Sequence, residues 1–168
     1  MIKLHITRYD LPAMIDARGY TRGVEVGLDH GYFSYYLLKH SNLRMLWSVD
    51  SFQGKWHVLE PEVRSMLSEF GDRSQIFVGT SAQAAGFFQN TRVEFDFVYI
   101  DACHKQQSVK QDINLWRKVI RPGGMLAGHD YIRAGGCGVV QAVDEFATSN
   151  GLEVSFTREP WATWMITL

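Results

Sequence analysis

Two apolar runs separated by a helical pattern constrain the fold more than any other part of this chain. The first run, residues 95–100, ends on Asp101, and the second, residues 125–128, ends on His129 and Asp130. Between the two runs, apolar side chains recur at helical spacing at Val109, Ile113, Trp116 and Ile120. This pattern predicts a strand–helix–strand crossover whose two strands are parallel and adjacent.

The segment Arg121-Pro-Gly-Gly124 is predicted to stop that helix before the second strand. The carboxyl ends of adjacent parallel strands meet at one rim of the sheet, which is where open α/β folds bind ligands. Asp101 and Asp130 are therefore predicted to lie close together at a chemical centre.

Composition excludes several classes of protein. The chain has 168 residues, 46% of them hydrophobic, which predicts one globular domain over residues 1–168. A net charge of −1 gives no reason to expect nucleic acid or an anionic membrane as partner. No apolar run approaches a signal-peptide core or the roughly 20 residues of a membrane span. Two cysteines are too few for a disulfide scaffold, so a cytoplasmic location is expected.

The remaining elements alternate between strand and helix. A short N-terminal helical segment is expected at about residues 8–19. Further strands are predicted at residues 24–28, 45–49 and 76–78, and helices at residues 59–70 and 82–89 and from residue 32 onward. After a glycine-rich loop at residues 134–138 come a helix around residues 139–146 and two strands, 153–157 and 163–168. The fold class is therefore α/β, a Rossmann-like, doubly wound, mostly parallel sheet with an antiparallel C-terminal strand pair.

Gly27 and Gly31 fall on a predicted strand-to-helix turn, where glycine lets the backbone approach a ligand closely. Asp29 stands where a dinucleotide-binding fingerprint has its middle glycine, and its charge would repel a pyrophosphate but suit a ligand that carries an ammonium group. Asp50, at the end of the next strand, is suited to bind a ribose diol. The alternative is a tight turn at Gly27 and a solvated aspartate at the strand end.

Five segments, in this order, resemble the class I S-adenosylmethionine-dependent methyltransferases: VEVGLDHGYFS, WSVD, VGTS, DFVYIDACH and RPGGMLAGHDY. Within that class the chain is most similar to the small-molecule group that contains the metal-dependent O-methyltransferases of the catechol and sugar types. The resemblance covers roughly Gly23 to Glu145.

The resemblance implies a set of residues that bind S-adenosylmethionine: Glu25, Gly27, Asp29, Gly31, Asp50, Ser51, Thr80, Ser81 and Asp101. Two features depart from the family pattern. Asp29 leaves no glycine between Gly27 and Gly31, and the long N-terminal helical region that caps the substrate in many relatives is missing. We therefore expect a pocket that is open or is completed by another subunit, and size alone suggests a homodimer.

The resemblance also implies a divalent metal, Mg or Mn, bound by Asp101, His129 and Asp130. Two carboxylates at one point need a cation or a proton between them, and magnesium prefers oxygen ligands. Imidazole suits softer metals better, and successive strand residues face opposite ways. Three options stay open: a softer metal, binding by Asp101 and Asp130 alone, or no metal, with His129 contacting the substrate.

By the same resemblance, His104 is the general base and acts beside Asp101 as a catalytic residue. A helix-capping or surface histidine is the plain alternative. A zinc site that includes Cys103 and Cys137 is disfavoured because no CxxC or HxxxH spacing is present.

The predicted function is methyl transfer to a small hydroxylated acceptor, with neither nucleic acid nor membrane as partner. One alternative is a metal-independent methyltransferase of another acceptor atom. Others are a non-catalytic cofactor-binding module and, more weakly, a nicotinamide dehydrogenase, which Asp29 opposes.

Overall fold

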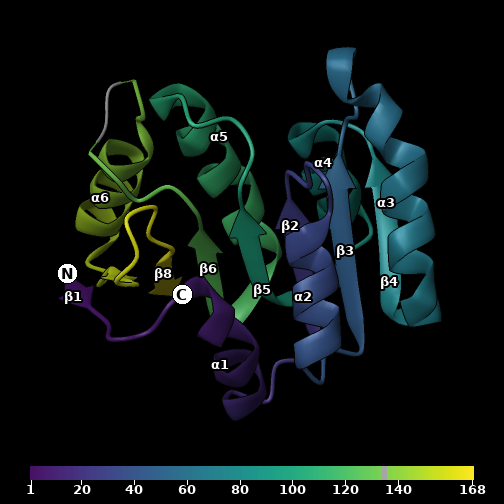
Figure 1. Cartoon of the computed structure of the whole chain (residues 1–168). Helices are drawn as coiled ribbons and strands as arrows, with labels where there is room; N and C mark the ends of the chain where they lie inside the picture. The colour runs from purple at the N-terminus through teal and green to yellow at the C-terminus, as the bar shows by residue number, and fades with distance from the viewer. Residues whose placement is uncertain (134–135) are drawn as a thin grey trace.

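An eight-stranded sheet forms the centre of the protein in a computed structural model that describes residues 1–133 and 136–168 (Figure 1). The strands are β1 (Ile2–Lys3), β2 (Arg22–Val26), β3 (Met45–Asp50), β4 (Ser74–Val78), β5 (Phe95–Ile100), β6 (Ile120–Gly128), β7 (Ser155–Phe156) and β8 (Trp164–Thr167). Their order in the sheet is β1-β7-β8-β6-β5-β2-β3-β4. Among the described strands, only the pairs of β8, with β6 and with β7, are antiparallel, which confirms the predicted mostly parallel sheet with an antiparallel C-terminal pair.

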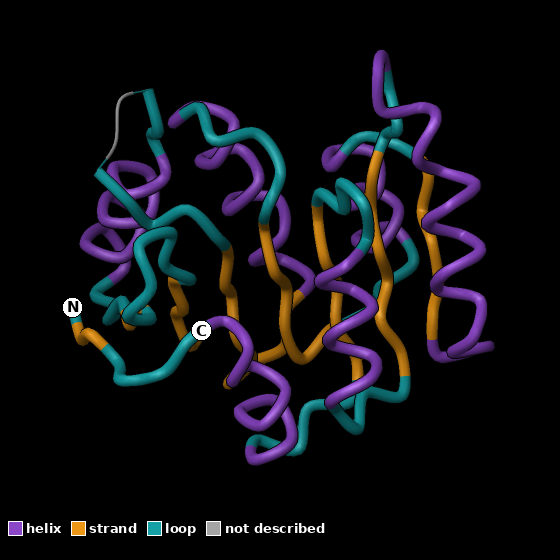
Figure 2. Tube along the Cα trace, viewed as in Figure 1, coloured by secondary structure: helices purple, strands orange, loops and turns teal. Residues whose placement is uncertain are grey.

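Helices cover both faces of this sheet (Figures 1 and 2). They are α1 (Leu11–Ala17), α2 (Tyr32–His40), α3 (Glu60–Leu67), α4 (Ser81–Asn90), α5 (Gln106–Trp116) and α6 (Val139–Asn150). The first three bury Leu11, Leu37 and Val63 in a core on one face. The last three bury residues such as Ile113 and Val143 in a separate core on the other face. Two cores on opposite faces define the expected doubly wound architecture.

Four 3₁₀ segments complete the described helices: η1 (Arg8–Asp10), η2 (Gly54–Leu59), η3 (Ser68–Arg73) and η4 (Arg117–Val119). The predicted N-terminal helical segment corresponds to η1 followed by α1, and the helix predicted at residues 59–70 corresponds to α3 with η2 and η3 at its ends. Of the predicted glycine-rich loop at residues 134–138, Ala134 and Gly135 lie outside the described residues.

The crossover helix ends earlier than the sequence pattern predicts. Ile120, which continues the helical spacing, is the first residue of β6 and pairs with Phe95, whereas Phe97 pairs with Met125. The segment from Arg121 to Gly124 is therefore an irregular stretch inside the strand and not a helix stop. A side chain at Gly124 would lie 2.7 Å from the Asp96 carbonyl oxygen, so the strands approach closely there.

The strand order creates a crevice between β2 and β5. The chain runs from β2 through β3 to β4 on one side, then crosses to β5 on the other side of β2. Ligands bind at such a switch point in open α/β sheets, beyond the carboxyl ends of the strands. Every residue of β5 is buried, as expected for a strand covered on both faces. The residues that follow β2 and β5 are therefore the first to reach solvent at this rim.

The N-terminal strand β1 was not predicted. It pairs with β7 in parallel, and the Arg158 N–H donates to the Ile6 carbonyl oxygen at 3.0 Å. The N-terminal segment is thus fixed along the edge of the sheet before it turns into η1 and α1 (Figure 1). Within residues 1–133 and 136–168, no helix has the length and apolar character needed to cross a membrane.

Candidate active site

The turn after β2 is pressed against the end of β5. Gly27 has a φ of +91°, and a Cβ at this position would lie 2.2 Å from the Asp101 carbonyl oxygen. The Gly27 N–H donates to Val49 and the Asp101 N–H donates to Val26, both at 2.8 Å. Only glycine fits this position, so the predicted glycine turn lies in the crevice between β2 and β5.

Asp50 ends β3 on the same rim. Its carboxylate accepts one hydrogen bond from the Leu28 N–H and another from the Phe52 N–H, each at 2.8 Å. These bonds fix the carboxylate beside the glycine turn. Each oxygen keeps a lone pair for a ligand hydroxyl, so Asp50 is suited to bind a diol.

Glu25 is a buried carboxyl group beneath the turn, with 2% of its surface exposed. The Ser34 hydroxyl donates to it, and Ser34 lies 2.6 Å from the Ser48 hydroxyl. Burial raises the pKa of Glu25 to about 8, although the hydrogen bond from Ser34 opposes this shift. A cation brought close to Glu25 would favour its ionised form.

A cavity of about 920 Å³ opens above the rim. Seven of the predicted site residues are among its described lining: Glu25, Gly27, Asp29, Asp50, Ser51, Asp101 and His104. Gly31, Thr80 and Ser81 are not among the described lining residues. Gly31 is instead the N-cap of α2, with a φ of +74°.

Thr80 and Ser81 have partners elsewhere. Thr80 caps α4, because its Oγ1 accepts from the Gln83 N–H at 3.2 Å. The Ser81 hydroxyl donates to Asp112 and accepts from the Trp116 indole N–H at 2.9 Å. The two Ser81 contacts hold α4 against α5. A role of Thr80 or Ser81 in cofactor binding stays a prediction.

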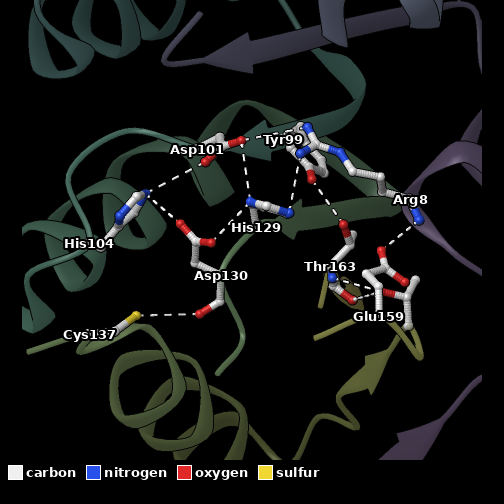
Figure 3. A network of polar contacts seen from close by, with 10 residues as sticks. Arg8, Tyr99, Asp101, His104, His129, Asp130, Cys137, Glu159 and Thr163 are labelled. Atoms are coloured by element: carbon white, nitrogen blue, oxygen red, sulfur yellow. Dashed lines mark hydrogen bonds and ion pairs between the residues drawn. The ribbon is translucent and has the colours of Figure 1, made fainter. Parts of the chain in front are cut away.

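Asp101, His104 and Asp130 form an acid–imidazole cluster beside the cavity (Figure 3). Each residue offers one donor atom, and the three atoms lie within 4.8 Å of one another. His104 Nε2 is 2.8 Å from Asp130 Oδ2 and 3.6 Å from Asp101 Oδ1. Hydrogen bonding to Asp101 and the charge of Asp130 raise the pKa of His104. Neither Cys103 nor Cys137 contributes to this donor group among the described residues.

His129 lies beside the cluster but uses both ring nitrogens (Figure 3). Its Nε2 is 3.2 Å from Arg8 Nη1, and its Nδ1 is 3.1 Å from Asp130 Oδ1. A guanidinium only donates, so Nε2 accepts and Nδ1 carries the proton that is shared with Asp130. Burial opposes the shift, but this hydrogen bond and nearby positive charges lower the pKa of Asp130.

The backbone explains how adjacent residues reach one site. Strand β6 ends at Gly128, so the alternation of side chains no longer applies to His129 and Asp130. Asp130 has a φ of +58°, in the left-handed region, and its carboxylate contacts both His104 and His129. The structure thus brings Asp101 and Asp130 together as predicted. His104 joins them in the group of three converging donor atoms. His129 Nδ1 also lies 3.7 Å from Asp101 Oδ2, so its predicted role as a metal ligand stays a prediction.

Arg8 is a site residue that the sequence analysis missed, because an isolated arginine outside any motif indicates solvated surface. Its side chain is 19% exposed, its Nη2 lies 3.6 Å from Asp101 Oδ2, and its guanidinium lies 4.0 Å from the centre of the Phe33 ring. The alternation of Ile2, Leu4 and Ile6 with polar residues is the signal that could have revealed the N-terminal strand that positions it.

The chain belongs to a methyltransferase family: residues 24–131 match the family model described as "Methyltransferase domain". This match confirms the predicted class of protein and includes the glycine turn, Asp50 and the acid–imidazole cluster. The comparison with curated protein sequences found no match.

Solved structures share the fold at low sequence identity. An O-methyltransferase from Bacillus cereus in complex with SAH has a TM-score of 0.75 at 17% identity, with 96% of this chain and 80% of that chain covered. The O-methyltransferase TomG from Streptomyces achromogenes, involved in tomaymycin synthesis and in complex with SAM, gives 0.69 at 18%, covering 95% and 78%. A putative rRNA-methylase from Clostridium thermocellum gives 0.69 at 13%, covering 98% and 99%. These likenesses confirm the predicted Rossmann-like methyltransferase fold.

Proposed function

We propose that this protein transfers a methyl group from S-adenosylmethionine to a hydroxyl group of a small molecule, assisted by a divalent cation. One observation carries the proposal: Asp101 belongs to both halves of the site. Its backbone packs against the glycine turn, and its carboxylate belongs to the acid–imidazole cluster. A cofactor at the turn and an acceptor at the cluster would therefore meet at one residue.

The chain's own groups suit S-adenosylmethionine. The close contact at Gly27 leaves backbone in place of a side chain beside the ligand, and Asp50 offers carboxylate oxygens to ribose hydroxyls. Glu25 and Asp29 suit the positive charges of the cofactor, and the cavity volume falls within the range of small-molecule sites. When bound, S-adenosylmethionine supplies an electrophilic methyl group on its sulfonium.

The acid–imidazole cluster suits a divalent cation, which Asp101, His104 and Asp130 would hold. Two carboxylates and one imidazole accommodate manganese or iron more readily than magnesium, which prefers an all-oxygen set. A bound cation lowers the pKa of an acceptor hydroxyl. His129 would orient Asp130 from the side, because its Nδ1–H donates to that carboxylate.

In the absence of a cation, His104 would take a proton from the acceptor. It is partly exposed at the cavity, and both carboxylates contact its Nε2. Those contacts orient the ring and favour its protonated form. The metal-independent alternative would assign to His104 the role of general base.

The cavity favours a small acceptor over nucleic acid. Its described lining carries four acidic residues and one arginine, which opposes a polyanion. Aromatic side chains in the lining, Tyr9, Tyr32 and Tyr36, offer flat apolar surface to an aromatic or cyclic acceptor. The proposal extends to residues 1–168 acting as one domain in the cytoplasm, with a homodimer as the expected assembly.

The proposal is tested by methyl transfer from radiolabelled S-adenosylmethionine to a panel of catechols and hydroxylated sugars. Each reaction is run with manganese, with magnesium and with excess chelator. Transfer that is lost in chelator and restored by manganese supports the full proposal. Equal transfer in chelator would contradict the role of the cation, and binding without transfer to any acceptor would favour a non-catalytic module.

A further inference from the structure

Among its Asp, Glu, Lys and Arg residues, the described lining of the cavity is acidic with one exception. Asp29, Asp50 and Asp101 contribute carboxylates, Glu25 contributes a buried carboxyl group that a nearby cation would ionise, and Arg8 is the single lysine or arginine among the described lining residues. S-adenosylmethionine carries a sulfonium and an ammonium, which the carboxylates attract, together with an α-carboxylate, which they repel. To bind the α-carboxylate in this acidic lining, the cavity therefore needs a positively charged side chain.

Arg8 is held rigidly at this position. Its backbone N–H donates to Glu159 Oε1 at 2.7 Å, and its guanidinium lies 4.0 Å from the centre of the Phe33 ring. The ring contact fixes the plane of the guanidinium, and Tyr99 lies further below it, 5.7 Å away. A guanidinium fixed in this way can present two parallel donors to a carboxylate.

The hydrogen-bonding capacity of Arg8 is largely unused. Its Nη1 lies 3.2 Å from His129 Nε2, but its Nη2 is 3.6 Å from Asp101 Oδ2, longer than an ordinary hydrogen bond. Its Nε is buried and has no hydrogen-bond partner among the described residues. A guanidinium has five N–H donors, four of them on Nη1 and Nη2, so Nη donors that His129 does not use remain for a ligand.

Arg8 lies at the Asp101 end of the cavity, because its Nη2 is 3.6 Å from Asp101 Oδ2. Asp50 ends β3, Glu25 lies in β2, and Asp101 follows β5, and these three strands are consecutive in the sheet. A nucleoside held by Asp50 would direct its amino-acid end across β2 toward Asp101, where Arg8 lies. The ammonium and carboxylate of that end would thus meet Glu25 and Arg8.

We propose that Arg8 binds the α-carboxylate of the cofactor's methionine end through its guanidinium and thereby makes the cavity selective for a carboxylate-bearing nucleoside. This inference rests on the proposed function. A carboxylate on the acceptor would satisfy the same donors, and the experiment below separates the two sources.

Calorimetry compares two ligands that differ in one group: S-adenosylmethionine and decarboxylated S-adenosylmethionine. The proteins are the wild type, Arg8→Gln, Arg8→Lys and the control Arg158→Gln, which removes a positive charge from an exposed residue outside the described lining. We expect the wild type and the control to prefer S-adenosylmethionine by about tenfold or more. In Arg8→Gln that preference falls to about twofold or reverses, because the acidic lining then favours the more positive ligand, while the decarboxylated compound still binds. Arg8→Lys keeps the positive charge but loses the two parallel N–H donors of the guanidinium. Its preference is therefore expected to lie between those of the wild type and Arg8→Gln.

Two results would overturn the inference while leaving the proposed function intact: equal binding of both ligands by the wild type, or an unchanged preference in Arg8→Gln. A carboxylate on the acceptor is tested by comparing the binding of catechol with that of 3,4-dihydroxybenzoate in the presence of S-adenosylhomocysteine. If Arg8→Gln changes the preference between these two acceptors but not the preference between the two nucleosides, the inference is also overturned. Binding of neither nucleoside by the folded wild type would overturn the proposed function, and the inference with it. If Arg8→Gln does not fold, the wild-type and Arg8→Lys preferences decide.

Discussion

Gly27 and Asp101 are in direct backbone contact, since a Cβ on Gly27 would lie 2.2 Å from the Asp101 carbonyl oxygen. The two residues are 74 positions apart in the sequence and directly follow the two strands that flank the switch point of the sheet. This contact joins the predicted cofactor turn to the predicted acceptor cluster. It also makes the position sensitive to the smallest change in side chain.

Gly27→Ala is expected to destabilise the protein by about 2 kcal/mol or more, because a methyl group would collide with backbone and because the φ of +91° disfavours any side chain. Urea unfolding measures the loss. The matched control is Gly86→Ala in α4, where a Cβ would meet nothing within 4 Å, so that stability is expected to hold or rise slightly. Equal effects of the two substitutions would contradict the account of the turn.

Asp101→Asn and Asp130→Asn are expected to abolish methyl transfer and to weaken manganese binding by roughly tenfold or more, because each removes an anionic donor from the acid–imidazole cluster. Binding of S-adenosylhomocysteine should persist in both variants. Electron paramagnetic resonance of manganese measures the free ion directly, and exposed Asp72→Asn is the control. Unchanged manganese binding in both variants would contradict a cation site at the acid–imidazole cluster.

His129→Asn separates the two histidines of the site. An asparagine amide can replace the Nδ1–H that donates to Asp130, so manganese affinity is expected to stay within about threefold of the wild type. His104→Ala removes a converging donor and is expected to lower the manganese affinity by roughly tenfold or more. The reverse order of effects would make His129 the metal ligand, as the sequence resemblance implies.

Glu25 is expected to make stability depend on pH. The native state keeps a proton on this carboxyl up to about pH 8, whereas the unfolded state loses it near its ordinary pKa of 4.5. Between these values the native state binds more protons, so the free energy of unfolding falls as pH rises. In Glu25→Gln this fall should be smaller by a few kcal/mol, at about 1.4 kcal/mol per pKa unit. Urea unfolding from pH 5 to 9 measures the free energy of unfolding at each pH, and exposed Glu153→Gln is the control. Parallel pH profiles for the wild type and Glu25→Gln would contradict this prediction.

Most of the sheet could be predicted because its strands carry strong local signals. The continuous apolar run of β5 predicts a buried strand, and acids at the ends of two such runs predict that Asp101 and Asp130 share one rim. The irregular start of β6 could not be predicted. Ile120 satisfies the helical spacing, and only its pairing with Phe95 assigns it to the sheet.

The site was predicted less completely because three of its features are tertiary. Arg8 reaches the cavity through the pairing of β1 with β7 at the edge of the sheet, and no motif near Arg8 reports that contact. Ser81 follows a strand end as expected, but its contacts with Asp112 and Trp116 on the neighbouring helix decide where its hydroxyl lies. The left-handed backbone at Asp130 is likewise set by the site around it.

The central claim is that the glycine turn and Asp50 bind S-adenosylmethionine. Titration calorimetry of the folded protein with S-adenosylhomocysteine tests it most directly. We expect a dissociation constant on the order of micromolar for the wild type and for exposed Asp72→Ala, and loss of binding in Asp50→Ala, which removes the carboxylate at the end of β3. A folded wild type that binds no S-adenosylhomocysteine, or an Asp50→Ala variant that binds it as tightly as the wild type, would contradict the account.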